Sequence, residues 1–181
     1  MSLIFEVDPV PDAALRAEYA ELWADVANAG GSAGYVPPLT AEELRSATEE
    51  VLEAAAAGID TLIIGRESIA GDAAGRGRLT ATASLVAGRH QDVVAHWRTV
   101  RRVMVRPDRQ GAGYGRLVMA EVERAARGLG LEALALRCRG QTGNDLFYKK
   151  CGYAEYGRMP KGLKLGPGDY REQILMMLPL D

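Results

Sequence analysis

A glycine-rich stretch, Asp108–Gly115 with the sequence DRQGAGYG, carries the residues best suited to bind an anion. It follows an apolar run, Val103–Val105, and precedes a segment with helical periodicity. Glycines let backbone N–H groups converge on one point without an intervening Cβ, and a helix start adds its dipole to the attraction. The stretch Arg98–Arg116 holds six arginines and one acid, a local charge of +5 in a chain of net charge −2. These residues fit either an anion-binding loop or a plain strand-to-helix turn with a solvated arginine face.

Neither of the two common nucleotide-binding patterns fits this loop. A dinucleotide fingerprint, G-x-G-x-x-G, that starts at Gly111 meets Arg116 where glycine or alanine is required. One that starts at Gly113 meets Val118 at the same place. A P-loop needs a lysine followed by serine or threonine, and the stretch has neither. A nucleotide-binding regulatory domain, which would bind ATP or NAD, is therefore a poor alternative.

A resemblance to a known family rests on this loop and on a second segment. Gln110, Gly113 and Gly115 follow a strand ending in VMVRP and resemble the acetyl-CoA loop of the GCN5-related N-acetyltransferases, the GNAT family, with its pattern Q/R-x-x-G-x-G/A. The segment Leu146–Pro160, LFYKKCGYAEYGRMP, is similar to the YxKxGF segment of the same family. Three short pieces resemble more weakly the tabtoxin-resistance acetyltransferase type: GGSAGY, VMVRPDRQGAGYG and YGRMPKG.

The resemblance implies that acetyl-CoA is the co-substrate and that the loop backbone binds its pyrophosphate. Backbone groups at the strand end, Met104 and Val105, would contact the pantetheine arm, and an N–H near them would polarise the thioester carbonyl. The family often has an asparagine seven residues before its tyrosine; here Gln141 has that place and Asn144 lies one turn later. The implied cofactor-binding residues are Met104, Val105, Gln110, Gly111, Ala112, Gly113, Tyr114, Gly115, Gln141 and Asn144.

The resemblance also assigns the catalytic acid. Tyr148 matches the family's tyrosine, which would protonate the departing CoA thiolate, and a phenol with a pKa of about 10 suits that task. The alternative is a tyrosine packed in the core. The general base is harder to assign, because the strand predicted at 96–105 has no acid. His96 is the best local candidate by chemistry, His90 is a weaker one, and a chain of waters is the other route.

An acceptor cleft is expected beside these residues. Arg137 and Arg139 share one face of their predicted strand, and together with Arg101 they could bind an acceptor carboxylate or simply face water. The loop GGSAGYVPP corresponds to the family's variable loop over the acceptor, with Tyr35 as a possible lining residue, although a plain surface loop fits equally. The two cysteines, at positions 138 and 151, are expected to be buried small hydrophobes rather than nucleophiles, because direct transfer needs no acyl-enzyme.

The helices and strands that must position these residues can be predicted from hydrophobic periodicity and from capping and helix-ending residues. Asp12 is a plausible N-cap for a first helix ending at Gly30–Gly31, and Thr40 with Glu43 forms a capping box for a second helix ending at Gly58. A third helix follows the glycine loop, with its apolar stripe on Val118, Val122, Ala125 and Leu129, and a short fourth helix spans 142–153. Strands are predicted at 3–7, 60–67, 77–88, 96–105, 131–139, 153–160 and 170–180.

The resulting order is β-α-α-β-β-β-α-β-α-β-β, a single α/β domain over residues 1–181. We expect a GNAT-like mixed, mostly antiparallel central sheet flanked by helices. The strand–helix–strand crossover makes the strands at 96–105 and 131–139 a parallel pair, and the family resemblance implies that they splay apart near their ends.

Composition narrows the class of protein further. Hydrophobic residues make up 48% of the chain and charged residues 25%, which suits a packed globular protein. The small net charge argues against nucleic-acid or membrane surfaces as partners, and two cysteines outside any metal-ligand spacing indicate no disulfide framework and no metal site. No signal peptide or spanning segment is predicted, so a cytoplasmic protein is expected.

We therefore expect a GNAT-type acyltransferase that moves an acetyl group from acetyl-CoA directly to a primary amine of a small molecule, amino-acid-like or antibiotic-like. A non-catalytic CoA-binding sensory module and a protein N-acetyltransferase are the alternatives. A monomer and a homodimer both fit, and the sequence does not identify the acceptor.

Overall fold

The computed structural model describes residues 3–31, 33–68, 76–88 and 92–180, and the strands among them join into one seven-stranded sheet. The strands are β1 (Leu3–Val7), β2 (Thr61–Glu67), β3 (Arg78–Val86), β4 (Trp97–Val105), β5 (Ala133–Arg139), β6 (Ala154–Gly166) and β7 (Asp169–Pro179). The α-helices are α1 (Ala13–Asn28), α2 (Arg45–Ala56), α3 (Tyr114–Gly128) and α4 (Asn144–Lys150). Short 3-10 turns lie at Asp92–Val94 and Pro107–Arg109. The predicted order of strands and helices is confirmed.

The strands lie in the order β1-β2-β3-β4-β5-β7-β6. Every neighbouring pair is antiparallel except β4 and β5, which are parallel. The parallel pair follows from the chain path, because α3 connects β4 to β5 and a crossover returns the chain in its original direction. The predicted mixed, mostly antiparallel sheet is confirmed.

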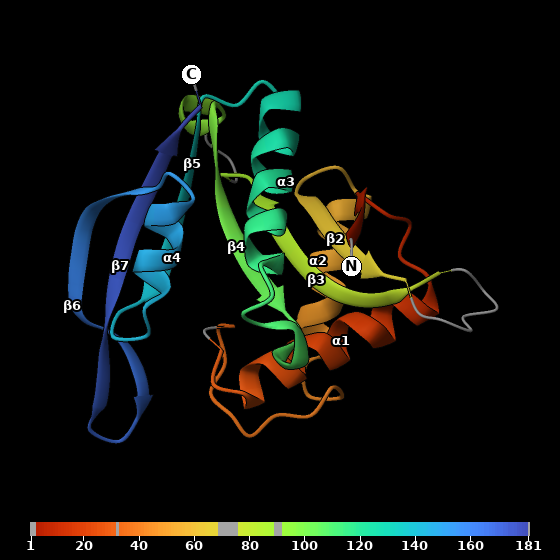
Figure 1. Cartoon of the computed structure of the whole chain (residues 1–181), viewed down its shortest axis with the longest axis horizontal. Coiled ribbons are helices and arrows are strands. Elements are labelled where there is room, and N and C mark those ends of the chain that lie inside the picture. The colour runs from red at the N-terminus through yellow and green to blue at the C-terminus, as the bar shows by residue number, and fades with distance from the viewer. Residues whose placement is uncertain (1–2, 32, 69–75, 89–91, 181) are drawn as a thin grey trace.

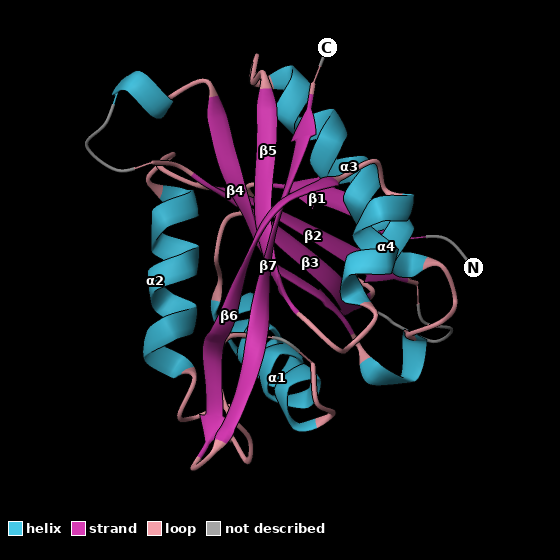
Figure 2. Ribbon diagram, turned by 90° about the vertical axis from the view of Figure 1, so that its left-hand side faces the viewer, coloured by secondary structure: helices cyan, strands magenta, loops and turns pink. Residues whose placement is uncertain are grey.

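Helices cover both faces of the sheet (Figure 1). α3 and α4 pack on one face and α1 and α2 on the other, and Figure 2 shows the strands between these two layers. Each face has its own hydrophobic core. The α3-side core includes Val118, Val122 and Leu134, and the α1-side core includes Tyr19 and Trp23.

The predicted helix starts are present as hydrogen bonds. The Asp12 carboxylate accepts the Leu15 N–H at 2.8 Å, which caps α1. The Glu43 carboxylate accepts the Thr40 N–H at 2.8 Å, and the Thr40 hydroxyl accepts the Glu43 N–H at 3.3 Å. The capping box is thus reciprocal, although the regular turns of α2 begin only at Arg45 because residues 41–44 form turns.

Two local expectations were wrong. The segment between the last two strands was predicted as a connection, but β6 continues to Gly166 and pairs with β7 along a long hairpin. Leu129 was predicted on the buried stripe of α3, but its side chain is 48% exposed because the helix ends at Gly128. Among the described residues, no helix is both long and apolar enough to span a bilayer.

Candidate active site

Strands β4 and β5 separate part-way along their length (Figure 1). They pair only where Trp97–Thr99 lies beside Ala133–Ala135. Beyond that point β4 continues beside β3, and β5 continues beside β7. Among the described strands, the facing edges of these two therefore have no partner, and the predicted opening between them is confirmed.

Two cavities meet at this opening. We call the first the arginine cavity; it has a volume of about 530 Å³ and is bordered by both strands, α1 and the loop after α1. We call the second the loop cavity; it has a volume of about 740 Å³ and is bordered by the glycine loop and α4. Val103, Arg137, Cys138 and Tyr148 line both cavities. Molecules held in the two cavities would therefore meet beside these four residues.

A β-bulge in β4 lies at the same point. Ala83 of β3 stands opposite both Arg102 and Val103 of β4, and Arg102 has a left-handed φ of +52°. The extra residue reverses the alternation of side chains: Val100 belongs to the α3-side core and Met104 to the α1-side core, although an even spacing would put both on one face. The bulge thereby determines on which side of the sheet each side chain at the end of β4 lies.

The glycine loop has the geometry of an anion cradle. Gly111 and Gly113 have φ values of +80° and +87°, and no atom lies within 4 Å of a Cβ built on either residue. Their N–H groups donate no hydrogen bond within the described part of the chain. The N–H groups of Tyr114 and Gly115 begin α3 and have no intrahelical acceptor. Three of these four residues, Gly111, Gly113 and Gly115, line the loop cavity, where the positive end of the helix dipole adds to their N–H donors.

Other parts of the loop bind the protein itself. The Gln110 N–H donates to the Pro107 carbonyl and the Ala112 N–H to the Arg109 carbonyl, each at 3.4 Å. The Gln110 side-chain amide donates to the Val105 carbonyl at 3.1 Å, which ties the loop to the end of β4. The loop therefore has fewer free donors than its sequence implied.

The other residues predicted to bind the cofactor do not all line the loop cavity. Asn144 lines it, whereas Gln141 is exposed, lines neither cavity and accepts a hydrogen bond from Arg171 at 3.2 Å. The Met104 side chain is buried in the α1-side core, so only its backbone is left for a ligand in the opening. Gly115 has a packing role, because a Cβ there would lie 3.1 Å from Cζ of Phe147 on α4.

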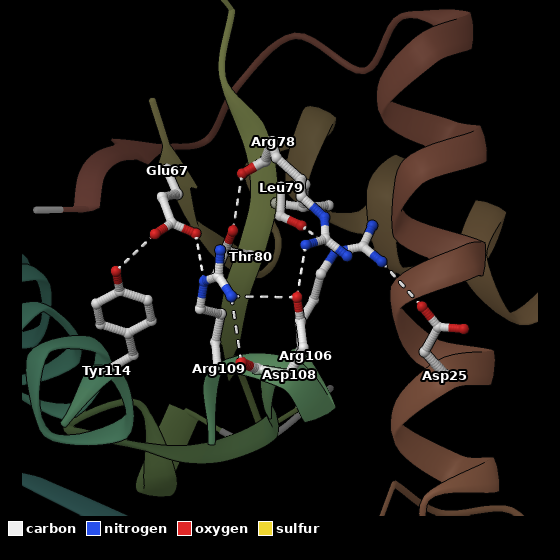
Figure 3. Close-up of polar contacts among 9 residues, drawn as sticks. All are labelled: Asp25, Glu67, Arg78, Leu79, Thr80, Arg106, Asp108, Arg109 and Tyr114. Atoms are coloured by element: carbon white, nitrogen blue, oxygen red, sulfur yellow. Dashed lines mark hydrogen bonds and ion pairs between the residues drawn. The ribbon is translucent and has the colours of Figure 1, made fainter. Parts of the chain in front are cut away.

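Glu67, which the sequence did not single out, fixes the loop from β2 (Figure 3). Its carboxylate accepts from Arg109 Nε at 2.7 Å and from the Tyr114 hydroxyl at 2.9 Å. The guanidinium of Arg109 holds the pKa of the Glu67 carboxyl below its usual value. A second pair, Arg78 Nη1 with Asp108 Oδ2 at 2.8 Å, ties the 3-10 turn before the loop to β3. The acidic partners could not be assigned from local sequence, because they are distant along the chain.

The six arginines near the loop go to different places, and two of them, Arg106 and Arg109, make anchoring contacts within the protein. Arg106 is buried and donates to the Leu79 carbonyl at 2.7 Å and to the Asp25 carboxylate at 2.8 Å (Figure 3). Arg109 is paired with acids, as described above. Of the six arginines, only Arg116 lines the loop cavity. An anion in this cavity would depend on backbone donors more than on a field of arginines.

Tyr148 lies on α4 where the two cavities join. Its ring makes edge contacts with Phe147 and Tyr153, with centroids 5.0 and 6.0 Å away. Burial, followed by the neighbouring thiols of Cys138 and Cys151, raises the pKa of the phenol. Tyr148 therefore stays protonated near neutral pH and has a proton to donate, although the raised pKa makes it a weaker acid than a free phenol. The predicted position of Tyr148 beside the opening agrees with an acid role.

The cysteines are not arranged as nucleophiles. Cys138 is buried, and burial raises the pKa of its thiol to about 11, so the reactive thiolate is scarce near neutral pH. Cys151 is partly buried, and burial raises its pKa as well. Cys138 matches the expectation of a buried small hydrophobe, and Cys151 matches it in part.

The residues considered for an acceptor cleft come together in the arginine cavity. Arg101, Arg137, Arg139 and Tyr35, for which either an acceptor cleft or a solvated surface was open, all line it. Arg102 lines it too and was missed, because regular alternation would have turned it to the opposite face. Its guanidinium lies 4.9 Å from the ring centre of Trp23 on α1.

No acid and no histidine is among the described residues that line either cavity. His96 is exposed in the turn before β4, outside both cavities, and its carbonyl accepts the Glu132 N–H at 2.8 Å. The structure therefore does not bring His96 to the opening. The weaker candidate, His90, lies outside the described residues.

Sequence comparison agrees with this geometry. Residues 65–155, just over half of the 181, match the model of the acetyltransferase (GNAT) domain. The chain therefore belongs to the GNAT acetyltransferase family, a family of acyltransferases. No curated protein matches the chain in sequence.

Solved structures match the fold over almost the whole chain. A candidate phosphinothricin N-acetyltransferase is 16% identical with a TM-score of 0.77, and 98% of this chain covers 99% of that one. A candidate acetyltransferase of Salmonella typhimurium, solved with its cofactor acetyl-CoA, is 20% identical with a TM-score of 0.73, covering 100% and 95% of the two chains. A ribosomal-protein-alanine N-acetyltransferase of Brucella melitensis is 17% identical with a TM-score of 0.75, covering 98% and 100%. Since the names of these proteins include both a small-molecule and a protein acceptor, the fold alone does not select the acceptor.

Proposed function

We propose that residues 1–181 form an N-acetyltransferase domain that binds acetyl-CoA in the loop cavity and acetylates a primary amine of a small molecule in the arginine cavity. The observation that carries the proposal is that the two cavities meet at Tyr148, a protonated acid. A direct transfer needs the thioester, the amine and the proton donor in one place. The acetyl-CoA-bound neighbour supports the choice of co-substrate.

The loop residues fit the donor by shape. The uncovered backbone at Gly111 and Gly113 would let a pyrophosphate approach. The free N–H groups of these two glycines, and those of Tyr114 and Gly115, would bind its oxygens. Asn144, at the start of α4, would contact the same molecule. The open edge of β4 near Val105 would hold the pantetheine arm. We do not place Gln141 at the donor, because it lies outside the loop cavity.

The proposed step is a direct transfer. The amine nitrogen forms a bond to the thioester carbonyl carbon, the C–S bond breaks, and the sulfur takes its proton from Tyr148. The nitrogen loses its proton to water, since no acid or histidine is among the described residues lining the cavities. The phenolate of Tyr148 is reprotonated by solvent after release.

Substitution of Tyr148 tests this assignment. Thiol release from acetyl-CoA should fall by about 100- to 10,000-fold in Tyr148→Phe, the usual contribution of a general acid, while acetyl-CoA affinity stays near that of the wild type. Tyr156→Phe is the matched control, because that ring is 60% exposed on β6 and lines neither cavity. Undiminished turnover in Tyr148→Phe would remove the tyrosine from the mechanism.

A non-catalytic CoA-binding module is the second candidate. The observation that favours it is again the lack of an acid or histidine among the described residues of the cavities. Assays of acetyl-CoA binding and of thiol release with a panel of amines distinguish the two functions. Stable binding without thiol release for any amine would favour the binding module.

A further inference from the structure

The arginine cavity concentrates positive charge that the protein does not neutralise. Its lining includes two arginines from β4, Arg101 and Arg102, and two from β5, Arg137 and Arg139, with no acid or histidine among its described lining residues. The rest of the chain pairs most of its arginines with carboxylates, as for Arg106 on the α1 face. A cluster of like charges is therefore specific to this cavity.

None of the four guanidinium groups has a carboxylate partner within the described ranges. Arg101 and Arg137 make no hydrogen bond or ion pair there, and Arg102 and Arg139 each keep a buried Nε without a partner. Among the residues that the structure describes, the Arg139 guanidinium donates only to the carbonyl of Gly30. Burial, together with the charges of Arg102 and Arg137, lowers the pKa of Arg101, and the opposite charge of Asp60 offsets only part of this effect. The cluster is thus short of negative charge, and an anionic ligand would relieve it.

The backbone is arranged to keep this cluster together. The bulge turns two consecutive residues of β4, Arg101 and Arg102, toward the same cavity, at the cost of a left-handed conformation for Arg102. A strained non-glycine conformation persists only where the surrounding structure holds it, and such conformations gather at functional sites. On the opposite wall, normal alternation turns Arg137 and Arg139 the same way.

We propose that the acceptor is a small amine with two acidic groups, one held by the arginines of β4 and the other by those of β5. The inference rests on the proposed function and names its substrate class. Guanidinium groups bind carboxylates and phosphates with paired hydrogen bonds, and two diverging strands present two such sites. Polyamines and protein lysines would bring further positive charge into the cavity, and the field would repel them.

Matched acceptors test the charge requirement directly. With acetyl-CoA as donor, glutamate and O-phosphoserine should be acetylated with kcat/KM values about 10- to 150-fold above those for glutamine and serine, the usual effect of one charged hydrogen-bonding group. Spermidine and a lysine peptide should be poor acceptors. Equal rates for glutamate and glutamine, or a preference for spermidine, would overturn the inference and leave the proposed transferase intact.

Substitutions locate the effect. Arg101→Gln and Arg137→Gln, both at exposed residues, should each lower kcat/KM for glutamate by about 10- to 150-fold. Glutamine keeps one acid, so only the substitution on the strand that holds that acid should lower its kcat/KM, and the other should change it little. Arg98→Gln is the control, because Arg98 lies on β4 outside the cavity and donates to the Thr61 hydroxyl. An unchanged preference for glutamate in both cavity variants would contradict the assignment.

A binding measurement separates this inference from the proposed function. Glutarate has two acids and no amine, so calorimetry can compare its affinity with that of glutaramate whether or not any acetyl transfer occurs. Tighter binding of glutarate, lost in Arg137→Gln, would support the dianion site even if no amine were acetylated. Equal affinity for the two acids would refute it.

Discussion

The left-handed conformation of Gly113 allows a strict test of the loop as the donor site. Gly113 has a φ of +87°, and no atom lies within 4 Å of a built Cβ, so Gly113→Ala introduces backbone strain without a clash. An L-residue in this region costs about 1–2 kcal/mol. For a chain of this size, that cost should lower the melting temperature by about 2–8 °C.

Gly130 provides a control matched for strain. It has a φ of +70°, its built Cβ also has no atom within 4 Å, and it lies after the other end of α3, outside both cavities. Gly130→Ala should therefore lose a similar amount of stability. Only the alanine at position 113 would also place a methyl group on the cradle and hinder the approach of a phosphate.

The two variants should thus separate in donor binding. If Gly113→Ala loses one charge-assisted N–H contact, worth about 1.5–3 kcal/mol, the Kd for CoA should rise by about 10- to 150-fold. Calorimetric titration with CoA measures this change, and scanning calorimetry measures the stability of the same samples. If CoA binds both variants equally well, the glycine loop is not the pyrophosphate site and the reasoning from its geometry fails.

Three further predictions concern the supports of the site. Glu67→Gln should raise the KM for acetyl-CoA with little change in kcat, because Glu67 anchors the loop through its charge, whereas Glu121→Gln on α3 should leave both constants unchanged in the same steady-state assay. Arg106→Met should lower the free energy of unfolding, measured in urea, by about 1–3 kcal/mol, since the Leu79 carbonyl loses its buried donor. The free energy of unfolding should also fall as pH rises from about 8.5 to 11, because the unfolded Cys138 thiol ionises near 8.5 while the folded one has a pKa of about 11. Urea titrations across this range should show a shallower fall in Cys138→Ala.

Local rules predicted most of the fold. Asp12 at a helix start, the Thr40–Glu43 capping box and the crossover around α3 depend on neighbours in sequence, and each appears as expected. The failures have local causes too. The long hairpin after residue 160 was missed because KGLKLGPGD contains four glycine or proline residues, which are typical of turns.

The site was harder to predict where it depends on register and on distant partners. Arg102 was not expected in the arginine cavity, because a bulge inverts the alternation and no residue type in β4 indicates a bulge. Glu67 is 42 residues from Arg109, so their pairing follows from the sheet order and not from any spacing. The contacts of the arginines near the loop could not be predicted for the same reason, because they depend on which distant acids the fold brings close to them.

The arginine cavity also bears on how the acceptor loses its proton. An ammonium group surrounded by guanidinium groups is destabilised by like charge, so its pKa falls and more of the amine is neutral at a given pH. Two acids on the acceptor would offset only part of the charge of the four arginines. The field of the cavity would then do much of the work that other active sites give to a carboxylate base, and ordinary water would suffice to carry the proton away.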